Sequence, residues 1–266
     1  MTLSLFVANY AAILPLMTVL WIVSVAKRNV SIVDPFWSIA FLIPTVRTAL
    51  GTGLSEKKIA LLLAVTLWSL RLFVHLFVRG LGKPEDPRYA AFRQRYGERR
   101  YWWFSFFQVF VLQGTLAALI SLPLQITAAA PVSAALSIVD WVGLSLFALG
   151  FLCEAIADEQ LRRFRALPKD PNRVLCTGLW RYSRHPNYFG EALLGFGLWL
   201  LSVDQPGGWL SVLAPIAMTF LLVKVSGVAM LDAYMTKTRP AYADYVRRTS
   251  AFVPFWPRPS QDTGRL

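Results

Sequence analysis

Polar and charged side chains recur at helical spacing inside strongly apolar parts of this sequence. Residues three or four positions apart share one face of a helix, and ionisable residues at membrane depth are costly enough to be functional candidates. Arginine binds phosphate through parallel hydrogen bonds, while carboxylates accept hydrogen bonds from ribose hydroxyls. The spacing therefore predicts a cavity for a phosphorylated nucleotide, and a lipid-headgroup or solvated basic edge is the alternative. The three polar stripes are Arg71, His75 and Arg79; Glu154, Asp158, Arg162 and Arg165; and Asn187 with Glu191.

Other kinds of site are disfavoured by what the sequence lacks. The chain has two histidines and two cysteines, which are too few for a zinc or iron–sulfur centre, so no metal site is expected. It has no G-x-G-x-x-G run after a strand and no Walker A sequence. A nucleotide site would therefore have to be built by side chains of membrane helices. His75 suits a hydrogen-bonded core position, and His185, beside Pro186, suits a cap or a phosphate contact.

The elements that must position these residues are membrane helices. Of the 266 residues, 56% are hydrophobic and 16% are charged, against roughly 25% charged in a soluble domain. A membrane-crossing helix needs about 20 mostly apolar residues. The sequence predicts an all-α integral membrane protein, a single domain over residues 1–266 with seven transmembrane helices. The expected spans are residues 3–26, 31–50, 59–79, 103–127, 134–157, 187–203 and 209–231.

The basic residues predict the orientation of these spans. Two basic residues follow the first span, seven the third, seven the fifth and six the seventh, whereas the opposite loops hold Lys57 and Lys58. Because basic loops stay in the cytoplasm, we expect the N-terminus outside and the C-terminus in the cytoplasm. All three polar stripes then lie at the cytoplasmic end. The net charge of +12 is explained by these loops, so no nucleic-acid partner is expected.

One segment carries a specific resemblance to known proteins. The run GLWRYSRHPNYFGE, Gly178 to Glu191, resembles the C-terminal region of the steroid 5α-reductase superfamily. It is closer still to a bacterial branch of membrane proteins in that superfamily, the DUF1295-like proteins. That branch is also similar at residues 31–37 (SIVDPFW), at residues 85–89 (EDPRY), at Asp158 with Gln160, and at residues 248–255 (RTSAFVPF).

The resemblance implies a membrane-embedded reductase that uses NADPH to reduce a C=C bond conjugated to a carbonyl. Residues 155–255 would carry the cofactor-binding part, with Asn187 at the nicotinamide carboxamide and Glu191 at the same end. Asp158 and Arg165 would lie near adenosine. The remaining residues that the resemblance implies in the cofactor site are Arg71, Arg173 and Arg184 near the phosphates, with Tyr182, His185, Tyr188 and Tyr245 as neighbours.

The proton donor departs from the pattern of the steroid enzymes. Asp34 falls near the acidic residue that helps hold the substrate carbonyl, and it is the implied catalytic residue. Those enzymes place a tyrosine three residues before the arginine that matches Arg71, and this chain has Trp68 there. An indole N–H donates a hydrogen bond but cannot release a proton as a phenol can. The sequence therefore leaves both the substrate and the acid open.

A second class shares much of this segment. Isoprenylcysteine-type and phospholipid methyltransferases also carry an R-H-P-x-Y-x-G turn and bind S-adenosylmethionine. Asn187 and the many arginines favour the reductase, because S-adenosylmethionine has no phosphates to neutralise. A lipid or sterol sensor that kept the fold is a third possibility. For the reductase we expect a lipophilic substrate from the bilayer, contact with membrane lipid, a monomer, and a site facing the cytoplasm of a bacterial membrane.

Overall fold

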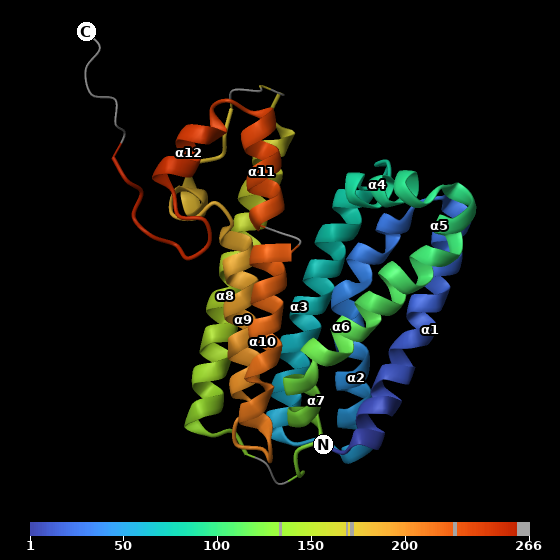
Figure 1. Ribbon diagram of the computed structural model, residues 1–266. Coiled ribbons are helices and arrows are strands. Elements are labelled where there is room, and N and C mark those ends of the chain that lie inside the picture. Colours follow the sequence, from blue (N-terminus) through green and yellow to red (C-terminus); the bar gives the residue numbers. More distant parts are fainter. Residues whose placement is uncertain (133–134, 169, 171–172, 226–227, 260–266) are drawn as a thin grey trace. The chain divides into compact units, whose positions relative to one another are not determined.

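The computed structural model describes residues 1–266 except 133–134, 169, 171–172, 226–227 and 260–266 (Figure 1). The described residues form helices joined by turns, with one isolated β-bridge between Ser183 and Ser250. Six helical segments are long and apolar enough to cross a membrane, so this is a multi-pass membrane protein. These segments are Leu3–Lys27, Val30–Thr52, Glu56–Gly80, Glu98–Ile120, Ile138–Ala166 and Gly208–Val225.

The remaining span expected from the sequence, residues 187–203, corresponds to a shorter helix. The structure forms α9 (Pro186–Leu200) there, which has 15 residues. At 1.5 Å per residue such a helix is about 22 Å long, below the roughly 30 Å of a bilayer core. The turn that follows Leu200 limits its length, so a crossing by this sixth segment, and with it a total of seven, stays a prediction.

The chain divides into two compact units, which we describe separately. Unit 1 comprises Met1–Asp140 and Leu201–Ala214, and unit 2 comprises Trp141–Leu200 and Pro215–Leu266. The elements of unit 1 are α1 (Leu3–Lys27), η1 (Val30–Phe36), α2 (Trp37–Thr52), α3 (Glu56–Gly80), α4 (Pro87–Tyr96), α5 (Glu98–Ser105), η2 (Phe106–Val111), α6 (Leu112–Ile120), α7 (Leu122–Ala128) and η4 (Gly208–Val212). Those of unit 2 are α8 (Ile138–Ala166), η3 (Gly178–Arg181), α9, α10 (Leu213–Phe220), η5 (Leu221–Val225), α11 (Val228–Thr238) and α12 (Tyr242–Arg248), of which α8 and α10 begin a few residues inside unit 1.

Helix starts in unit 1 follow from local capping. The side chains of Thr2, Ser55 and Asp86 accept hydrogen bonds from backbone N–H groups in the first turns of α1, α3 and α4. Such caps satisfy donors that a helix leaves unpaired. Figure 1 shows α1, α2 and α3 side by side, and α2 packs against both of the others. The short helix α4 lies at one end of this group, where it positions the polar residues of the 85–96 region.

Buried polar groups in unit 1 are satisfied by one another. Asn9 on α1 donates to Thr48 on α2 at 2.8 Å and to Gln125 on α7 at 2.9 Å. At the start of α3, the buried Lys57 lies 2.9 Å from Asp140 and 2.6 Å from Asp204. A buried ion pair is tolerated only when its charges are paired and hydrogen-bonded. These contacts therefore fix α3 to the 201–204 turn and to residue 140.

The close packing of α8 on α9 in unit 2 depends on glycine. A Cβ on Gly150 would lie 2.5 Å from the backbone nitrogen of Leu194, and a Cβ on Gly190 would lie 2.6 Å from that of Glu154. Gly197 on α9 makes a similar approach to Phe147 on α8. Small residues let membrane helices approach closely, which increases their van der Waals contact. The pairing sets Asn187 and Glu191 of α9 beside the polar stripe of α8.

Candidate functional site

The centre of the candidate site in unit 2 is the pair Asn187 and Asp158. The amide nitrogen Nδ2 of Asn187 donates to Oδ1 of Asp158 at 3.1 Å. An ionised carboxylate can only accept hydrogen bonds, so this contact fixes which end of the amide faces Asp158. The other end, the carbonyl oxygen Oδ1 of Asn187, is buried and has no hydrogen-bond partner in the described chain. The pair thus presents one buried acceptor that needs a donor.

The neighbours of this pair are polar residues of the same two helices. Asp158 and Glu191 are buried, with 5% and 8% of their surfaces exposed, and Glu154 is also buried. The ring of Tyr188 stacks on that of His185 with 5.5 Å between the ring centres and nearly parallel planes. The structure therefore gathers five of the predicted residues, Asp158, His185, Asn187, Tyr188 and Glu191, at the start of α9.

Arg184 lies in a separate cluster around Asp232. Its guanidinium donates to Asp232 at 2.6 Å and to the carbonyl oxygens of Thr249 and Val246 at 2.6 and 3.1 Å. Because these bonds engage most of its N–H groups, Arg184 joins the turn before α9 to α11 and to the chain after α12. Phosphate binding by Arg184 would have to displace these bonds.

Asp232 is the acceptor at the centre of this cluster. It also accepts hydrogen bonds from Nε2 of His185 at 3.1 Å and from the hydroxyl of Tyr242 at 2.5 Å. Burial acts to raise the pKa of Asp232, but the bonds from His185, Arg184 and Tyr242 outweigh it and hold the pKa well below its usual value. Burial and the neighbouring carboxylate raise the pKa of Tyr242. Asp232 therefore stays ionised and holds the turn rigidly.

Four other residues of unit 2 were predicted in the cofactor site: Tyr182, Tyr245, Arg165 and Arg173. Tyr245 donates to the carbonyl oxygens of Trp180 and Ser183, so its hydroxyl supports the turn before α9. The ring of Tyr182 contacts Trp256 edge to face. Arg165 and Arg173 are exposed at the end of α8 and in the loop after it. Their exposure leaves them at the surface of unit 2, and the roles implied for them, near adenosine for Arg165 and near the phosphates for Arg173, stay predictions.

The predicted residues Asp34 and Arg71 belong to unit 1. Asp34 accepts a hydrogen bond from the hydroxyl of Tyr89 at 2.6 Å, and Nη2 of Arg88 lies 3.4 Å from it. Nε2 of Gln113 donates to the Tyr89 oxygen at 3.2 Å. Arg71 lies on α3, half-buried. The carboxylate is thus held by an ionisable hydroxyl from α4.

Trp68, which precedes Arg71 by three residues, is buried in unit 1. Its ring packs edge to face on Phe41 with centres 5.5 Å apart. The indole N–H is buried and has no acceptor among the described residues. Trp68 therefore offers a hydrogen-bond donor but no acid.

Two residues with central contacts had no role in the sequence analysis. Tyr89 lies in the EDPRY run, which carried the resemblance without a chemical assignment. Burial and the Asp34 carboxylate raise the pKa of Tyr89, so its hydroxyl keeps its proton. Asp232 is 48 residues from Arg184 and carries no local signal. Only the packing of α11 on the turn before α9 brings it into the cluster.

The fold and these sites define an all-helical, multi-pass membrane protein with buried polar groups on its helices. The chain belongs to the family described as "Protein of unknown function (DUF1295)", whose family model matches residues 20–249. This family is associated with the steroid 5α-reductase-like superfamily, as the sequence resemblance implied.

A relative in another organism supports the same assignment. An uncharacterized protein of Schizosaccharomyces pombe is 31% identical over 206 residues, which cover 68% of this chain and 60% of that protein. The match thus spans less than two thirds of the yeast protein. No solved structure matches this chain.

Proposed function

We propose that this protein is a membrane-embedded NADPH-dependent reductase of a C=C bond conjugated to a carbonyl in a lipophilic substrate. The observation that carries the proposal is the buried carbonyl oxygen of Asn187, which lacks a hydrogen-bond partner in the described chain while its Nδ2 is held by Asp158. A buried acceptor without a donor is costly, so a ligand that supplies an N–H would be stabilised there. The carboxamide of nicotinamide carries such an N–H.

The residues around Asn187 would orient the cofactor. Asp158 fixes the amide of Asn187, and Asp232 with Arg184 holds the turn before α9 in place. NADPH would supply a hydride to the β-carbon of the substrate. Small errors in placing a hydride donor are costly in rate, so a rigid turn at this point supports catalysis. Arg173, a surface cation, would reach the phosphates, and Arg165 would lie near adenosine.

Asp34 and Tyr89 would serve the substrate. Negative charge develops on the carbonyl oxygen during reduction, and a hydrogen-bond donor there lowers the barrier. Ionised Asp34 accepts the single O–H of Tyr89, so in that state the hydroxyl would have to turn from Asp34 to the substrate oxygen, whereas protonated Asp34 could itself donate. Tyr89 thus offers the phenol that Trp68 cannot provide.

We also propose the finer membrane arrangement that the sequence predicts. The chain would cross seven times, with α9 and the turn after it as the short sixth span, the N-terminus outside and the C-terminus in the cytoplasm. The protein would act as a monomer in a bacterial cytoplasmic membrane and take its substrate from the bilayer. The site would then face cytosolic NADPH.

Cofactor binding tests the proposal. The melting temperature of the purified protein should rise with NADPH, less with NADH, and not with S-adenosylmethionine, because a ligand stabilises only the state it binds. A rise with S-adenosylmethionine alone would assign the protein to the methyltransferase class. Equal rises in melting temperature with NADH and NADPH would show that the site does not recognise the 2′-phosphate.

Two double variants test the role of Asn187. A single Asn187→Asp change would set two carboxylates against each other, so both partners must change together. The swap Asp158→Asn with Asn187→Asp keeps the hydrogen bond and an acceptor oxygen, whereas Asp158→Leu with Asn187→Leu removes both polar partners. NADPH affinity should fall about ten- to a hundredfold in the Leu pair and less in the swap. Unchanged affinity in a folded Leu pair would show that Asn187 does not bind the cofactor.

A further inference from the structure

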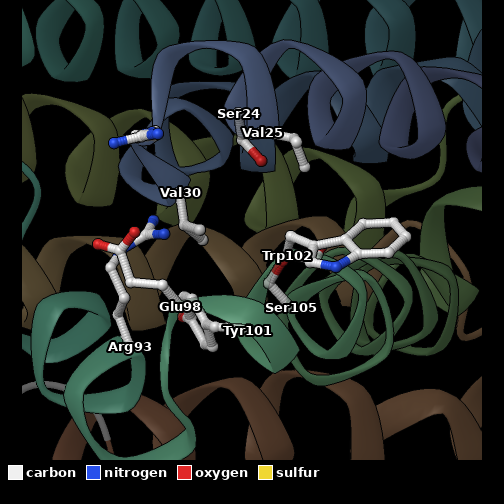
Figure 2. Close-up of a pocket in the computed structure, with 9 residues that line it drawn as sticks. Ser24, Val25, Val30, Arg93, Glu98, Tyr101, Trp102 and Ser105 are labelled. Carbon is white, nitrogen blue, oxygen red and sulfur yellow. Dashed lines mark hydrogen bonds between the residues drawn. The ribbon is translucent and has the colours of Figure 1, made fainter.

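A pocket of about 280 Å³ opens in unit 1 where α1 ends (Figure 2). Its walls come from the last turn of α1, the start of η1, α4 and α5. The volume is at the lower limit of ligand pockets, which suits a small polar group rather than a dinucleotide. None of the residues assigned to the proposed reaction lines it.

The surface around this pocket marks the edge of a bilayer. Along α1 the exposed side chains change from Val19, Ile22 and Val25 to Lys27 and Arg28. Trp21 and Trp102 stack beside this change, and the indole of Trp21 donates to the Trp102 carbonyl oxygen. Tryptophan is enriched where the apolar core meets the headgroups. The pocket therefore lies at headgroup depth, with Val25 and Trp102 in its wall.

Two donors in the pocket suit a phosphate. Arg28 lines the pocket, its side chain is exposed, and it forms no ion pair with a described residue. The hydroxyl of Tyr101 is buried and makes no hydrogen bond to any described residue. A guanidinium and a phenol can both donate to phosphate oxygens.

The backbone at Arg28 points to a use for its side chain. Arg28 is the only described non-glycine residue with positive φ, at 50°, and it ends α1 in the left-handed conformation. Glycine is the usual residue at such a position because it has no Cβ penalty. An arginine at this strained position indicates that its guanidinium has a role that glycine could not fill.

The two serines and Glu98 of the pocket can only accept hydrogen bonds. The hydroxyl protons of Ser24 and Ser105 are donated to the carbonyl oxygens of Trp21 and Trp102, at 2.8 and 3.0 Å. Glu98 contributes a carboxylate, which accepts. Arg93 is already paired with Glu85 at 2.8 Å. The pocket is thus lined by two cations, Arg28 and Arg93, and by one anion, Glu98, which also interacts electrostatically with Arg93. Arg28 and Glu98 are the groups left to contact the two charges of a zwitterion.

We propose that this pocket binds the headgroup of a phospholipid that carries a phosphate and a primary ammonium, that is, a phosphoethanolamine headgroup. The phosphate contacts Arg28 and Tyr101, and the ammonium contacts Glu98, Ser24 and Ser105. The occupant is a lipid headgroup rather than a free solute because Val25 and Trp102, which would contact lipid, form part of the wall.

The experiment measures binding of short-chain lipids to the delipidated protein in detergent. Dihexanoyl phosphatidylethanolamine should raise the melting temperature more than the choline or glycerol lipid of the same chain length, and more than inorganic phosphate. An equal effect of inorganic phosphate would overturn the proposal in favour of an anion site. An equal effect of the choline lipid, or no effect of any probe, would also overturn it.

Matched variants assign the contacts. Arg28→Gly relieves the positive φ, so the protein should fold at least as well while its affinity for the ethanolamine lipid falls about tenfold or more. Lys27→Ala removes the same charge one residue away and should leave affinity unchanged. Tyr101→Phe should weaken lipid binding without lowering the melting temperature of the lipid-free protein, because its hydroxyl has no partner there. Equal losses of lipid affinity in Lys27→Ala and Arg28→Gly would show that binding reflects general charge attraction, and would contradict the proposed headgroup site.

Discussion

At the scale of single residues, the proposed chemistry depends on two hydrogen-bonded pairs, one of which was more readily predicted from the sequence than the other. Asn187 and Asp158 were both predicted, because one lies in a specific run and the other on a regular helical stripe. Their contact at 3.1 Å was not predictable, since it depends on the approach of α9 to α8. Asp34 was predicted as the catalytic residue, but its partner Tyr89 was not. The two residues are 55 positions apart, and no sequence pattern linked one to the other.

Tyr89 gives the residue-scale prediction. Tyr89→Phe removes the O–H that Asp34 accepts, so turnover of an enone substrate should fall at least tenfold while the melting temperature changes little. The matched control is Tyr96→Phe on the same helix, where the ring of Tyr96 packs at a tilt against that of Phe104. The measurement is the steady-state rate of each variant compared with that of the wild type. Equal rates for Tyr89→Phe and wild type would remove Tyr89 from the mechanism.

At the scale of elements, the positions of helices were largely predictable from apolar runs, and their ends were not. Capping by Thr2, Ser55 and Asp86 explains three starts. The sequence predicts a short span over residues 187–203, and the structure ends α9 at Leu200 because the turn begins there, within the apolar run. The glycines of α8 and α9 were visible in the sequence, but their pairing was not, because it depends on which faces of the two helices meet.

The glycine packing gives a matched pair of substitutions on α9. Gly190→Ala would force a Cβ to within 2.6 Å of the α8 backbone, whereas Gly195→Ala meets its nearest atom at 3.8 Å. Overpacking costs about 1–3 kcal/mol, and alanine otherwise favours a helix. The melting temperature should therefore fall in Gly190→Ala and stay level or rise in Gly195→Ala. The reverse order would contradict the α8–α9 contact.

The Asp232 cluster gives a pH prediction. The pKa of Asp232 is lowered in the folded protein, against about 3.9 for an unfolded aspartate. Its stabilisation is therefore complete above about pH 4 and is lost as the pH falls toward the lower folded value. Asp232→Asn should melt at a lower temperature than wild type at pH 7, and the difference should narrow below about pH 4. A difference that stays constant with pH would show that the charge of Asp232 does not matter.

At the scale of the whole molecule, composition and charge predicted a multi-pass helical membrane protein, and the six long apolar helices confirm that class. The resemblance at residues 178–191 predicted the family, which the match over residues 20–249 confirms. The division into two compact units was not predictable, because no linker or change of composition marks it.

Orientation is tested by reporter fusions. Fusions after residues 90, 170 and 255 should report a cytoplasmic location, and fusions after residues 54, 132 and 206 an outside location, because basic loops stay inside. A cytoplasmic reading after residue 206 would remove the sixth crossing. A fully reversed pattern would put Asn187 on the side without NADPH.

The most direct test of the central proposal is turnover. Purified protein in detergent is incubated with NADPH and a lipid extract, and the products are compared by mass spectrometry with those from the Asp158→Leu, Asn187→Leu double variant. The proposal predicts lipid products heavier by two hydrogens, formed in step with NADPH oxidation and lost in the variant. Methylated products that require S-adenosylmethionine, or no NADPH-dependent product with a folded protein, would contradict it.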